Sequence, residues 1–218
     1  MNTLKDSKNS ALPREFFARD PRTVAKELLG KLLICRRERH ILAGRIVETE
    51  AYLGENDPAA HSASGKTKRN AVIFGPPGHA YVYFIYGKYY CLNVSCLPDG
   101  EAGCVLFRAL EPVSGIAEMG RARGMSQKPT NAKDLRSLTS GPSRLTMAFE
   151  ITRDNHNGTD MTNSSQGLWL TEDGFKPEHI LSTPRVGVSK AIEQELRYLL
   201  DGNRFVSCSK NLLRISIS

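Results

Sequence analysis

The sequence predicts one mixed domain in which helices flank a β-sheet. The chain has 218 residues, of which 40% are hydrophobic and 24% charged, a profile typical of a globular domain long enough to bury a core. Segments with strand and helix patterns are interspersed along it. No internal repeat, low-complexity block or shift in composition marks a boundary. We therefore expect a single domain over residues 13–218, preceded by a flexible polar tail over residues 1–12.

The first elements are predicted by capping residues and by apolar runs. Asp20 followed by Pro21 is a strong helix start, and Gly30 suits the end of the same helix. Strands are expected over residues 31–37 and 41–53. Residues 54–79 are rich in Gly, Pro, Asn, Asp and Ser, and segments of this length without regular structure are often functional.

The middle of the chain predicts a β-hairpin, because two aromatic and β-branched runs flank Gly87-Lys88, which suits a two-residue turn. Beyond it the pattern becomes less regular. Ser140-Gly-Pro-Ser143 is a breaker that can cap a short helix through Phe149. The other expected elements are strands over 80–85, 89–95 and 104–110, helices over 113–123 and 131–138, polar turns over 153–166, and late strands over 168–171, 185–188 and 205–209.

Cysteine and histidine usage argues against a metal centre. The cysteines are odd in number and include no Cys-x-x-Cys pair, and the five histidines do not cluster with them. Structural zinc usually needs closely spaced, paired ligands. We therefore expect no cofactor, and we expect reduced, buried thiols at Cys35, Cys91, Cys96, Cys104 and Cys208.

The charge of the chain favours a polyanionic partner. The net charge is +7 and the pI about 9.2. Residues 1–12 lack the apolar core of a secretory signal, and no apolar run approaches the length of a membrane span. We therefore expect an intracellular protein, and we expect a monomer. Lys66, Lys68 and Arg69 fall in one loop-like stretch, where cations can reach phosphates.

The run Arg-Ile-Val-Glu-Thr-Glu-Ala-Tyr-Leu-Gly over residues 45–54 has an unusual composition for a strand. Alternation places Glu48, Glu50 and Tyr52 on one face, opposite a face formed by Val47, Ala51 and Leu53. Acidic residues are depleted in strands. Taken alone, the run is explained most simply by a solvated sheet face, and a functional carboxylate is the alternative.

The predicted hairpin makes a functional carboxylate more plausible, because it carries five tyrosines: Tyr81, Tyr83, Tyr86, Tyr89 and Tyr90. Tyrosines in strands are also common in an ordinary core. Tyr86 directly precedes the predicted turn, so it would stand exposed at the apex. An aromatic ring there is poorly placed for a core and suited to enter between stacked bases. Tyr83 could stack on a ligand, Asn93 could read a hydrogen-bonding edge, and Arg108 could position an anion or a water molecule.

These motifs resemble the alkyladenine (3-methyladenine) DNA glycosylase family of the mammalian type. The resemblance covers nearly the whole chain, from Glu15-Phe-Phe to Phe205-Val-Ser. The motifs that carry it are the acidic strand at 45–54, Asp-Pro-Ala-Ala-His-Ser at 57–62, Tyr-Val-Tyr-Phe-Ile-Tyr-Gly at 81–87, Cys-Leu-Asn-Val-Ser at 91–95, Cys-Val-Leu-Phe-Arg-Ala-Leu-Glu-Pro at 104–112, Ser-Gly-Pro-Ser at 140–143 and Arg-Val-Gly at 185–187. Residues 193–200 are more acidic than the family pattern.

The resemblance implies an α+β (mixed) fold: a single domain with a curved antiparallel β-sheet flanked by helices, and a β-hairpin inserted into DNA. It also implies a monofunctional enzyme of base excision repair, cytoplasmic and nucleoid-associated or nuclear, acting on double-stranded DNA. Such an enzyme flips 3-methyladenine, 7-methylguanine, hypoxanthine or ethenoadenine out of the duplex and hydrolyses the N-glycosidic bond with a glutamate-activated water.

The resemblance further assigns roles to individual residues. The catalytic positions are Glu50 as general base, with Arg108 and the backbone carbonyl of Val188 as further ligands of the water. The damaged base would lie among Tyr52, His61, Tyr83 and Asn93. Tyr86 would fill the gap in the duplex, and the DNA backbone would be contacted by Lys66, Thr67, Lys88 and Arg144.

Elementary chemistry agrees with these roles. A base inside a duplex must leave the stack before a protein carboxylate can act next to it. A cationic alkylpurine stacks well on aromatic rings, and cleavage of its bond to the sugar develops an oxocarbenium ion that a carboxylate stabilises. Of the two strand carboxylates, Glu48 and Glu50, we expect Glu50 to be the general base. We expect one of the two to make structural hydrogen bonds instead. No lysine is singled out as a Schiff-base nucleophile.

Two other functions remain open on the residues alone. A non-catalytic damaged-DNA binding module would share the basic charge and the aromatic platform. A small-molecule nucleoside hydrolase would share the carboxylate chemistry but would not need an exposed Tyr86.

Overall fold

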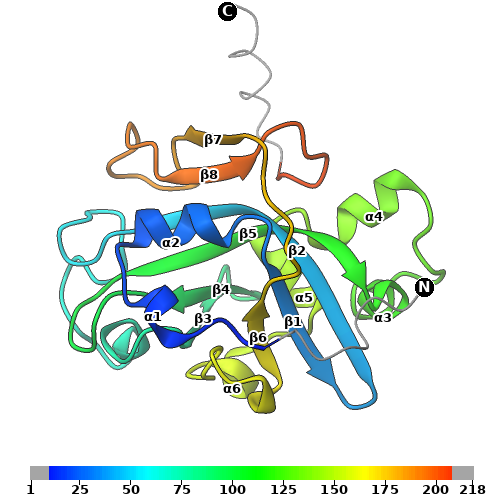
Figure 1. The fold of residues 1–218 in the computed structure, drawn as a ribbon, viewed down its shortest axis with the longest axis horizontal. Helices are drawn as coiled ribbons and strands as arrows, with labels where there is room; N and C mark the ends of the chain where they lie inside the picture. Colours follow the sequence, from blue (N-terminus) through cyan, green and yellow to red (C-terminus); the bar gives the residue numbers. More distant parts are fainter. Residues whose placement is uncertain (1–9, 208–218) are drawn as a thin grey trace, which may run out of the picture.

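The long strand β2 (His40–Tyr52) lies at the centre of the fold (Figure 1). One edge of β2 pairs with β5, and the other pairs first with β1 and then, over Glu48–Glu50, with β8. All these pairings are antiparallel, and the main path of the eight-stranded sheet runs β3-β4-β5-β2-β1-β6, with β7 and β8 joined to β2 beside it. The expected α+β fold around a curved antiparallel sheet is confirmed.

The computed structural model describes residues 10–207. In chain order its elements are α1 (Arg14–Phe17), α2 (Pro21–Leu28), β1 (Leu32–Arg37), β2, η1 (Ala71–Phe74), β3 (Ala80–Ile85), β4 (Tyr89–Ser95), β5 (Cys104–Ser114), α3 (Ile116–Ala122), α4 (Ala132–Thr139), α5 (Pro142–Ala148), α6 (Arg153–His156), η2 (Ser164–Gln166), β6 (Leu168–Thr171), β7 (Ile180–Thr183) and β8 (Arg197–Leu200).

The core explains the alternation along β2. Val47 and Ala51 are completely buried and join Phe107 of β5 in the main hydrophobic cluster. Helix α2 adds its apolar face to this cluster, and Thr49 Oγ1 donates to the backbone carbonyl of Ala25 in α2 at 2.9 Å. As predicted, α2 begins after Asp20, whose side chain accepts from the Arg22 N–H. The opposite face of β2 carries Glu48 and Glu50 and lies outside this hydrophobic cluster.

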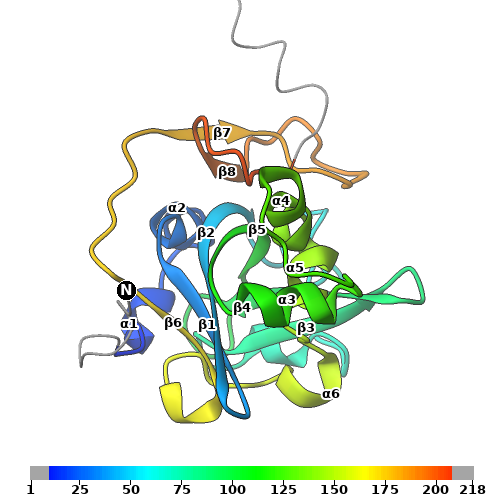
Figure 2. The ribbon, with the colours of Figure 1, turned by 90° about the vertical axis from the view of Figure 1, so that its right-hand side faces the viewer.

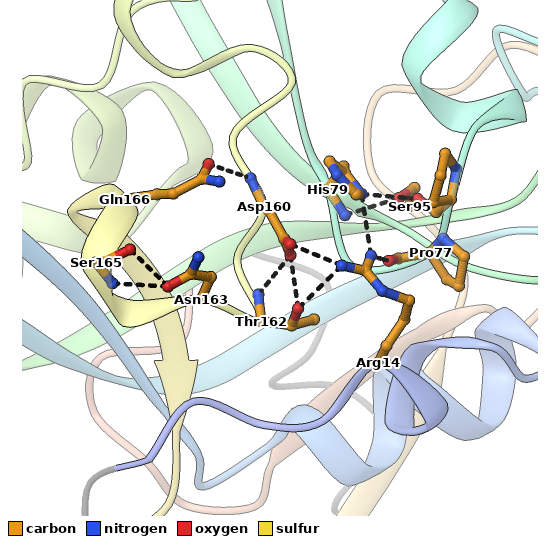
Figure 3. Close-up of polar contacts among 10 residues, drawn as sticks. Arg14, Pro77, His79, Ser95, Asp160, Thr162, Asn163, Ser165 and Gln166 are labelled. Carbon is orange, nitrogen blue, oxygen red and sulfur yellow. Dashed lines mark hydrogen bonds and ion pairs between the residues drawn. The ribbon is translucent and has the colours of Figure 1, made fainter.

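A polar cluster joins the start of the chain to the base of the hairpin (Figure 3). Arg14 in α1 donates to Asp160 at 2.6 Å and to the backbone carbonyl of Pro77 at 2.7 Å. His79 and Asp160 form an isolated antiparallel bridge, and the His79 N–H donates to Ser95 Oγ. These contacts connect α1, the segment before β3 and the segment after α6. They hold the first residues of the β3–β4 hairpin in place.

The late strands differ from the expectation. Residues 185–188, expected as a strand, form a loop in which Gly187 has a φ of +79°. The described residues 205–207 are also irregular, because Phe205 and Val206 donate to Asn203 in a turn. The strands in this region are β7 and β8 instead. Within 153–166, expected as turns, the structure adds the short helices α6 and η2.

The end of the expected tail is part of the packed domain. Leu12 is buried, and its N–H donates to the Leu170 carbonyl of β6 at 2.8 Å. The first nine residues of that tail lie outside the described residues, as does Cys208. The other four cysteines are buried and free. No helix in the described part of the chain is both long and apolar enough to cross a membrane.

Candidate active site

A cavity of about 270 Å³ opens on the face of the sheet opposite the main hydrophobic cluster. It gathers five of the residues singled out from the sequence. Four segments supply its lining: the end of β2 (Tyr52), the irregular segment (Pro58, Ala59, His61), the β3–β5 strands (Tyr81, Tyr83, Asn93, Cys104) and the loop after β7 (Gly187, Val188, Ser189, Lys190). Among residues 10–207, no three His, Cys, Asp or Glu side chains are grouped to hold a metal ion.

Strand register explains why these distant residues meet. Tyr52 lies directly opposite Cys104 of β5, and Asn93 of β4 lies opposite both Tyr81 and Leu106. Paired residues on antiparallel strands project to the same face. The side chains of four strands therefore converge on the cavity.

The aromatic residues form a wall with close ring contacts. The His61 ring meets Tyr83 edge-on, with centroids 4.5 Å apart, and Tyr83 is 5.4 Å from Tyr81. His61 Nδ1 is 3.0 Å from the Tyr81 hydroxyl. Partial desolvation in this packing, with repulsion from Arg69, lowers the pKa of His61, so the imidazole is neutral at neutral pH. A neutral wall does not repel a cationic base.

Asn93 forms part of the cavity lining in a fixed orientation. The residue is 2% exposed, and its Nδ2 donates to the backbone carbonyl of Tyr81 at 3.1 Å. The Cys104 thiol contacts its Oδ1 at 3.9 Å. Burial raises the pKa of Cys104 to about 12, so this thiol stays protonated and can act only as a weak donor.

Glu50 is not part of the cavity lining itself but contacts Tyr52, which is. It is fully buried, and its carboxylate accepts from the Tyr52 hydroxyl at 3.0 Å and from the Val186 N–H at 2.8 Å. Arg108 Nη1 lies 3.1 Å away. Burial and the nearby Glu50 charge raise the pKa of Tyr52, so its hydroxyl remains a donor. The solvated sheet face, the simpler explanation of the strand taken alone, is therefore wrong.

Glu48 has a different set of partners, which satisfy both of its oxygens. Arg197 of β8 donates at 2.6 Å and Arg108 at 2.9 Å, and the Ser207 N–H and hydroxyl donate at 2.6 and 2.8 Å. The carboxylate is fully buried away from the cavity lining. These contacts are those of a structural anchor.

The pairing of β2 with β5 is irregular around Glu48, where Val47 of β2 and Arg108 of β5 are each left without a partner. The register shifts on both sides of Glu48. Bulges of this kind re-aim side chains next to functional sites. Arg108 thereby contacts both carboxylates. Burial opposes its charge, but Glu50 and Glu48 outweigh this effect and raise the pKa of the guanidinium.

Tyr86 occupies a different turn position from the one predicted. Ile85 pairs with Tyr89, and the Lys88 N–H donates to the Ile85 carbonyl, so Tyr86-Gly87, not Gly87-Lys88, are the central residues. Their φ angles of +51° and +63° follow the type I′ pattern, which strains a bulky residue. Tyr86 is 86% exposed at the tip that projects from the molecule in Figure 2.

The expected DNA-backbone contacts are all exposed and come from three segments. Lys66 and Thr67 lie in the irregular segment, Lys88 in the hairpin turn and Arg144 in α5. Thr67 also has a local role, because its N–H and hydroxyl exchange hydrogen bonds with Asn70. Their contacts with DNA remain predictions.

Sequence reasoning missed several residues of the cavity and of the network beside it: Asp57, Arg185, Val186, Lys190, Arg197 and Ser207. Asp57 and Arg185 fall in motifs that carried the family resemblance, but neither was given a role. Val188 lines the cavity, yet the backbone group of its loop that contacts Glu50 is the Val186 N–H. Only the isolated basic residue within the acidic stretch 193–200, Arg197, signalled a buried partner for Glu48.

Comparison with known proteins gives one consistent result. A family model described as methylpurine-DNA glycosylase (MPG) matches residues 15–204. A protein of Koribacter versatilis is 55% identical over 201 residues, which are 92% of this chain and 95% of that protein. A protein of Methanoculleus marisnigri is 49% identical over 198 residues, or 90% and 98% of the two chains. Both carry the name "Putative 3-methyladenine DNA glycosylase".

Proposed function

The chain belongs to the methylpurine-DNA glycosylase family, and from this premise we propose that it removes alkylated or deaminated purines from double-stranded DNA by a Glu50-activated water. Membership makes it a DNA glycosylase, a hydrolase acting on N-glycosyl bonds. The proposed bases are 3-methyladenine, 7-methylguanine, hypoxanthine and ethenoadenine, and the proposed location is wherever genomic DNA lies, in a nucleoid or a nucleus.

One observation carries the mechanism: the buried carboxylate of Glu50 accepts a hydrogen bond from Tyr52, part of the aromatic wall of the cavity. Glu50 accepts hydrogen bonds from the Tyr52 hydroxyl and the Val186 N–H, and Arg108 lies 3.1 Å from it, so three donors orient its carboxylate. A carboxylate oriented in this way can accept a proton from water as the water attacks the sugar. It also stabilises the positive charge that develops on the sugar.

The cavity accounts for the need to extrude the base. Its lining is separated from the hairpin tip, where Tyr86 is exposed. A nucleotide that leaves the stack requires a few kcal/mol, least for a damaged base. Tyr86 would occupy the vacated space, and stacking on Tyr52, His61 and Tyr83 would return about 1–3 kcal/mol per aromatic contact.

The leaving group decides how much further catalysis is needed. A cationic alkylpurine leaves as a neutral base, so it needs no protein acid. Neutral hypoxanthine and ethenoadenine need protonation, for which water is available at the open side of the cavity. Lys190 lines the cavity but is exposed, unlike the enclosed amines that act as Schiff-base nucleophiles. We therefore propose a monofunctional enzyme without lyase activity.

A strand-cleavage assay tests this proposal. Labelled duplexes carrying one hypoxanthine or one ethenoadenine are incubated with the protein without added metal, and half of each sample is treated with hot alkali. Breaks that appear only after alkali support a monofunctional glycosylase. Breaks without alkali would contradict the absence of lyase activity. No release of any damaged purine, methylated DNA included, together with intact DNA binding would favour a non-catalytic damaged-DNA binding module instead.

A further inference from the structure

Arg185 is buried against Tyr52, one of the residues that line the cavity. Its side chain is fully buried, and its guanidinium donates to both oxygens of Asp57, at 2.5 and 2.9 Å, and to the backbone carbonyl of Ala51 at 3.1 Å. The same guanidinium lies 4.7 Å from the centre of the Tyr52 ring. Neither Arg185 nor Asp57 is part of the cavity lining.

These contacts join three of the four segments that supply the lining. Ala51 and Tyr52 belong to β2, Asp57 begins the turn that leads to His61, and Arg185 begins the loop that contains Val188. Asp57 also accepts from the N–H groups of Leu53 and Ala59, which fixes the turn itself. One ion pair therefore connects the segments that carry Tyr52, His61 and Val188.

The pair also reaches the proposed base. Val186, the residue after Arg185, donates its N–H to Glu50, and Tyr52, which stacks on Arg185, donates its hydroxyl to the same carboxylate. Two of the three partners of Glu50 thus depend on where the Arg185 backbone and guanidinium lie. The third partner, Arg108, comes from β5 and is held independently by Glu48.

From this geometry we propose that Arg185 and Asp57 are positioning residues of the glycosylase reaction. They hold Glu50 and the walls of the cavity at the positions that the extruded base requires. The inference rests on the proposed function. A buried ion pair is weak support for stability as such, because desolvation offsets most of its attraction. Arg185 even keeps a buried Nε donor without a protein partner within residues 10–207. Because desolvating the ion pair and the unpartnered Nε costs free energy, the pair is better explained by its effect on the positions of Tyr52 and the Val186 N–H.

Lysine cannot replace arginine in this role. Its ammonium would keep the charge, but it lacks the planar fork that binds both Asp57 oxygens and stacks on Tyr52. R185K is therefore a conservative test, and D57N, which keeps the volume of the side chain, removes the charge from the other partner.

The chain contains a matched control far along the sheet. Arg45 donates to both oxygens of Asp173, at 3.0 and 2.7 Å, and to the backbone carbonyl of Gly30 at 2.7 Å, and it lies 4.3 Å from the Phe175 ring centre. The chemistry thus repeats that of Arg185, but none of these residues lines the cavity. R45K removes the same kinds of contact from a less buried pair, whose side chains are 15% and 35% exposed, and none of these contacts reaches Glu50.

The experiment measures single-turnover excision of hypoxanthine with enzyme in excess, over a range of enzyme concentrations. Rates are normalised to the folded fraction, determined from binding to undamaged duplex and from near-UV circular dichroism. Because small misplacements of reacting groups can reduce rates about 10²-fold, we expect R185K and D57N to lower the saturated rate at least about tenfold. The concentration for half-maximal rate should change less, and R45K should match the wild type in both parameters.

The outcomes separate this inference from the function on which it rests. Wild-type protein that excises no damaged purine would overturn the proposed function and the inference together. Active wild type, with R185K and D57N at the wild-type saturated rate, would overturn the inference alone. Equal losses in R185K and R45K would also overturn it, because they would reflect a general effect of losing such a pair.

Discussion

Glu48 and Glu50 project from the same face of β2, two residues apart, and are equally buried, yet their partners give them different tasks. Glu48 accepts from Arg197 and Ser207, neither of which lines the cavity, whereas Glu50 accepts from Tyr52 of the cavity wall. Spacing in a strand could predict that both face one side. It could not predict which of the two is held by structural partners, because those partners, Arg197 and Ser207, lie far along the chain.

Replacing Glu48 should reduce stability. E48Q leaves Arg108 and Arg197 buried with one anionic partner fewer between them, and an uncompensated buried charge costs about 3–5 kcal/mol. We expect a loss near the lower limit, since the amide oxygen still accepts one hydrogen bond. Urea unfolding measures it. E118Q, which alters exposed ion pairs with His40 and Arg121, is the control and should change stability by less than about 1 kcal/mol. Equal effects would contradict the anchoring role.

Asp57 should make stability depend on acid pH. Burial alone would raise its pKa, but hydrogen bonds from Arg185, Ala59 and Leu53 outweigh this effect, so the pKa of Asp57 is lowered. A carboxyl whose folded pKa is depressed stabilises the protein above its unfolded pKa of about 3.9, and that contribution is lost as pH falls through the folded value. The stability difference between wild type and D57N should therefore be largest near neutral pH and shrink below about pH 4. A difference that does not vary with pH would contradict this assignment.

At the scale of elements, the β3–β4 hairpin combines local strain with an exposed ring. Type I′ turns favour Asn-Gly, because asparagine tolerates the left-handed conformation that Tyr86 adopts here. Strain retained at a surface tip is a sign of function. The sequence predicted the hairpin and the exposure of Tyr86. It placed the turn one residue too far along, because Gly87 suits either central position and only the strand pairing decides.

The substitution Y86N separates the strain of the turn from the exposed aromatic ring, because it relieves the first and removes the second. It should keep or raise the thermal midpoint, since the turn relaxes by roughly 0.5–1 kcal/mol. It should lower lesion affinity and excision, because the wedge is lost. Differential scanning calorimetry and titration of a lesion duplex measure both quantities. Y86F keeps the ring and the strain, so it should resemble the wild type. Unchanged lesion affinity in Y86N would exclude the wedge.

The strand β8 shows where local pattern reasoning failed. The acidic residues before it, Glu193 and Glu195, make the segment look solvated, but Arg197, Tyr198 and Leu199 are buried once β8 pairs with Glu48–Glu50 of β2. Arg197 is acceptable there only because Glu48 faces it. The strand expected at 185–188 is absent because Gly187 adopts a φ of +79°, which does not occur in a strand.

At the scale of the whole molecule, the net charge of +7 implies DNA binding that weakens with salt. The hairpin tip and the turn between β1 and β2 point in different directions in Figure 2. Cations at the two places should therefore contribute unequally to DNA binding. Lys88 lies beside Tyr86 at the hairpin tip, and Arg39 lies in the β1–β2 turn.

K88A should reduce the slope of log K against log salt concentration by about one unit, the value for one phosphate contact. R39A should leave the slope unchanged. Fluorescence anisotropy with a labelled duplex at several salt concentrations measures both. Equal slopes for K88A and wild type would remove Lys88 from the interface.

The overall architecture and the members of the cavity were largely predictable, because strand patterns and long motifs carry that information. The network beside the cavity was not. Its contacts join residues more than a hundred positions apart in the chain: Arg185 binds Asp57, and Arg197 and Ser207 bind Glu48. Such contacts follow from tertiary packing, which no local pattern encodes.

The most direct test of the proposed mechanism measures excision by E50Q on the hypoxanthine duplex. It uses single-turnover conditions and compares the variant with the wild type. The substitution keeps the size of the side chain and an acceptor for the Tyr52 hydroxyl, and removes the group that can accept a proton. We predict that E50Q folds, binds the lesion duplex with near wild-type affinity and loses at least about 10²-fold in excision rate. Excision at the wild-type rate by folded E50Q would contradict the proposal that Glu50 activates the attacking water.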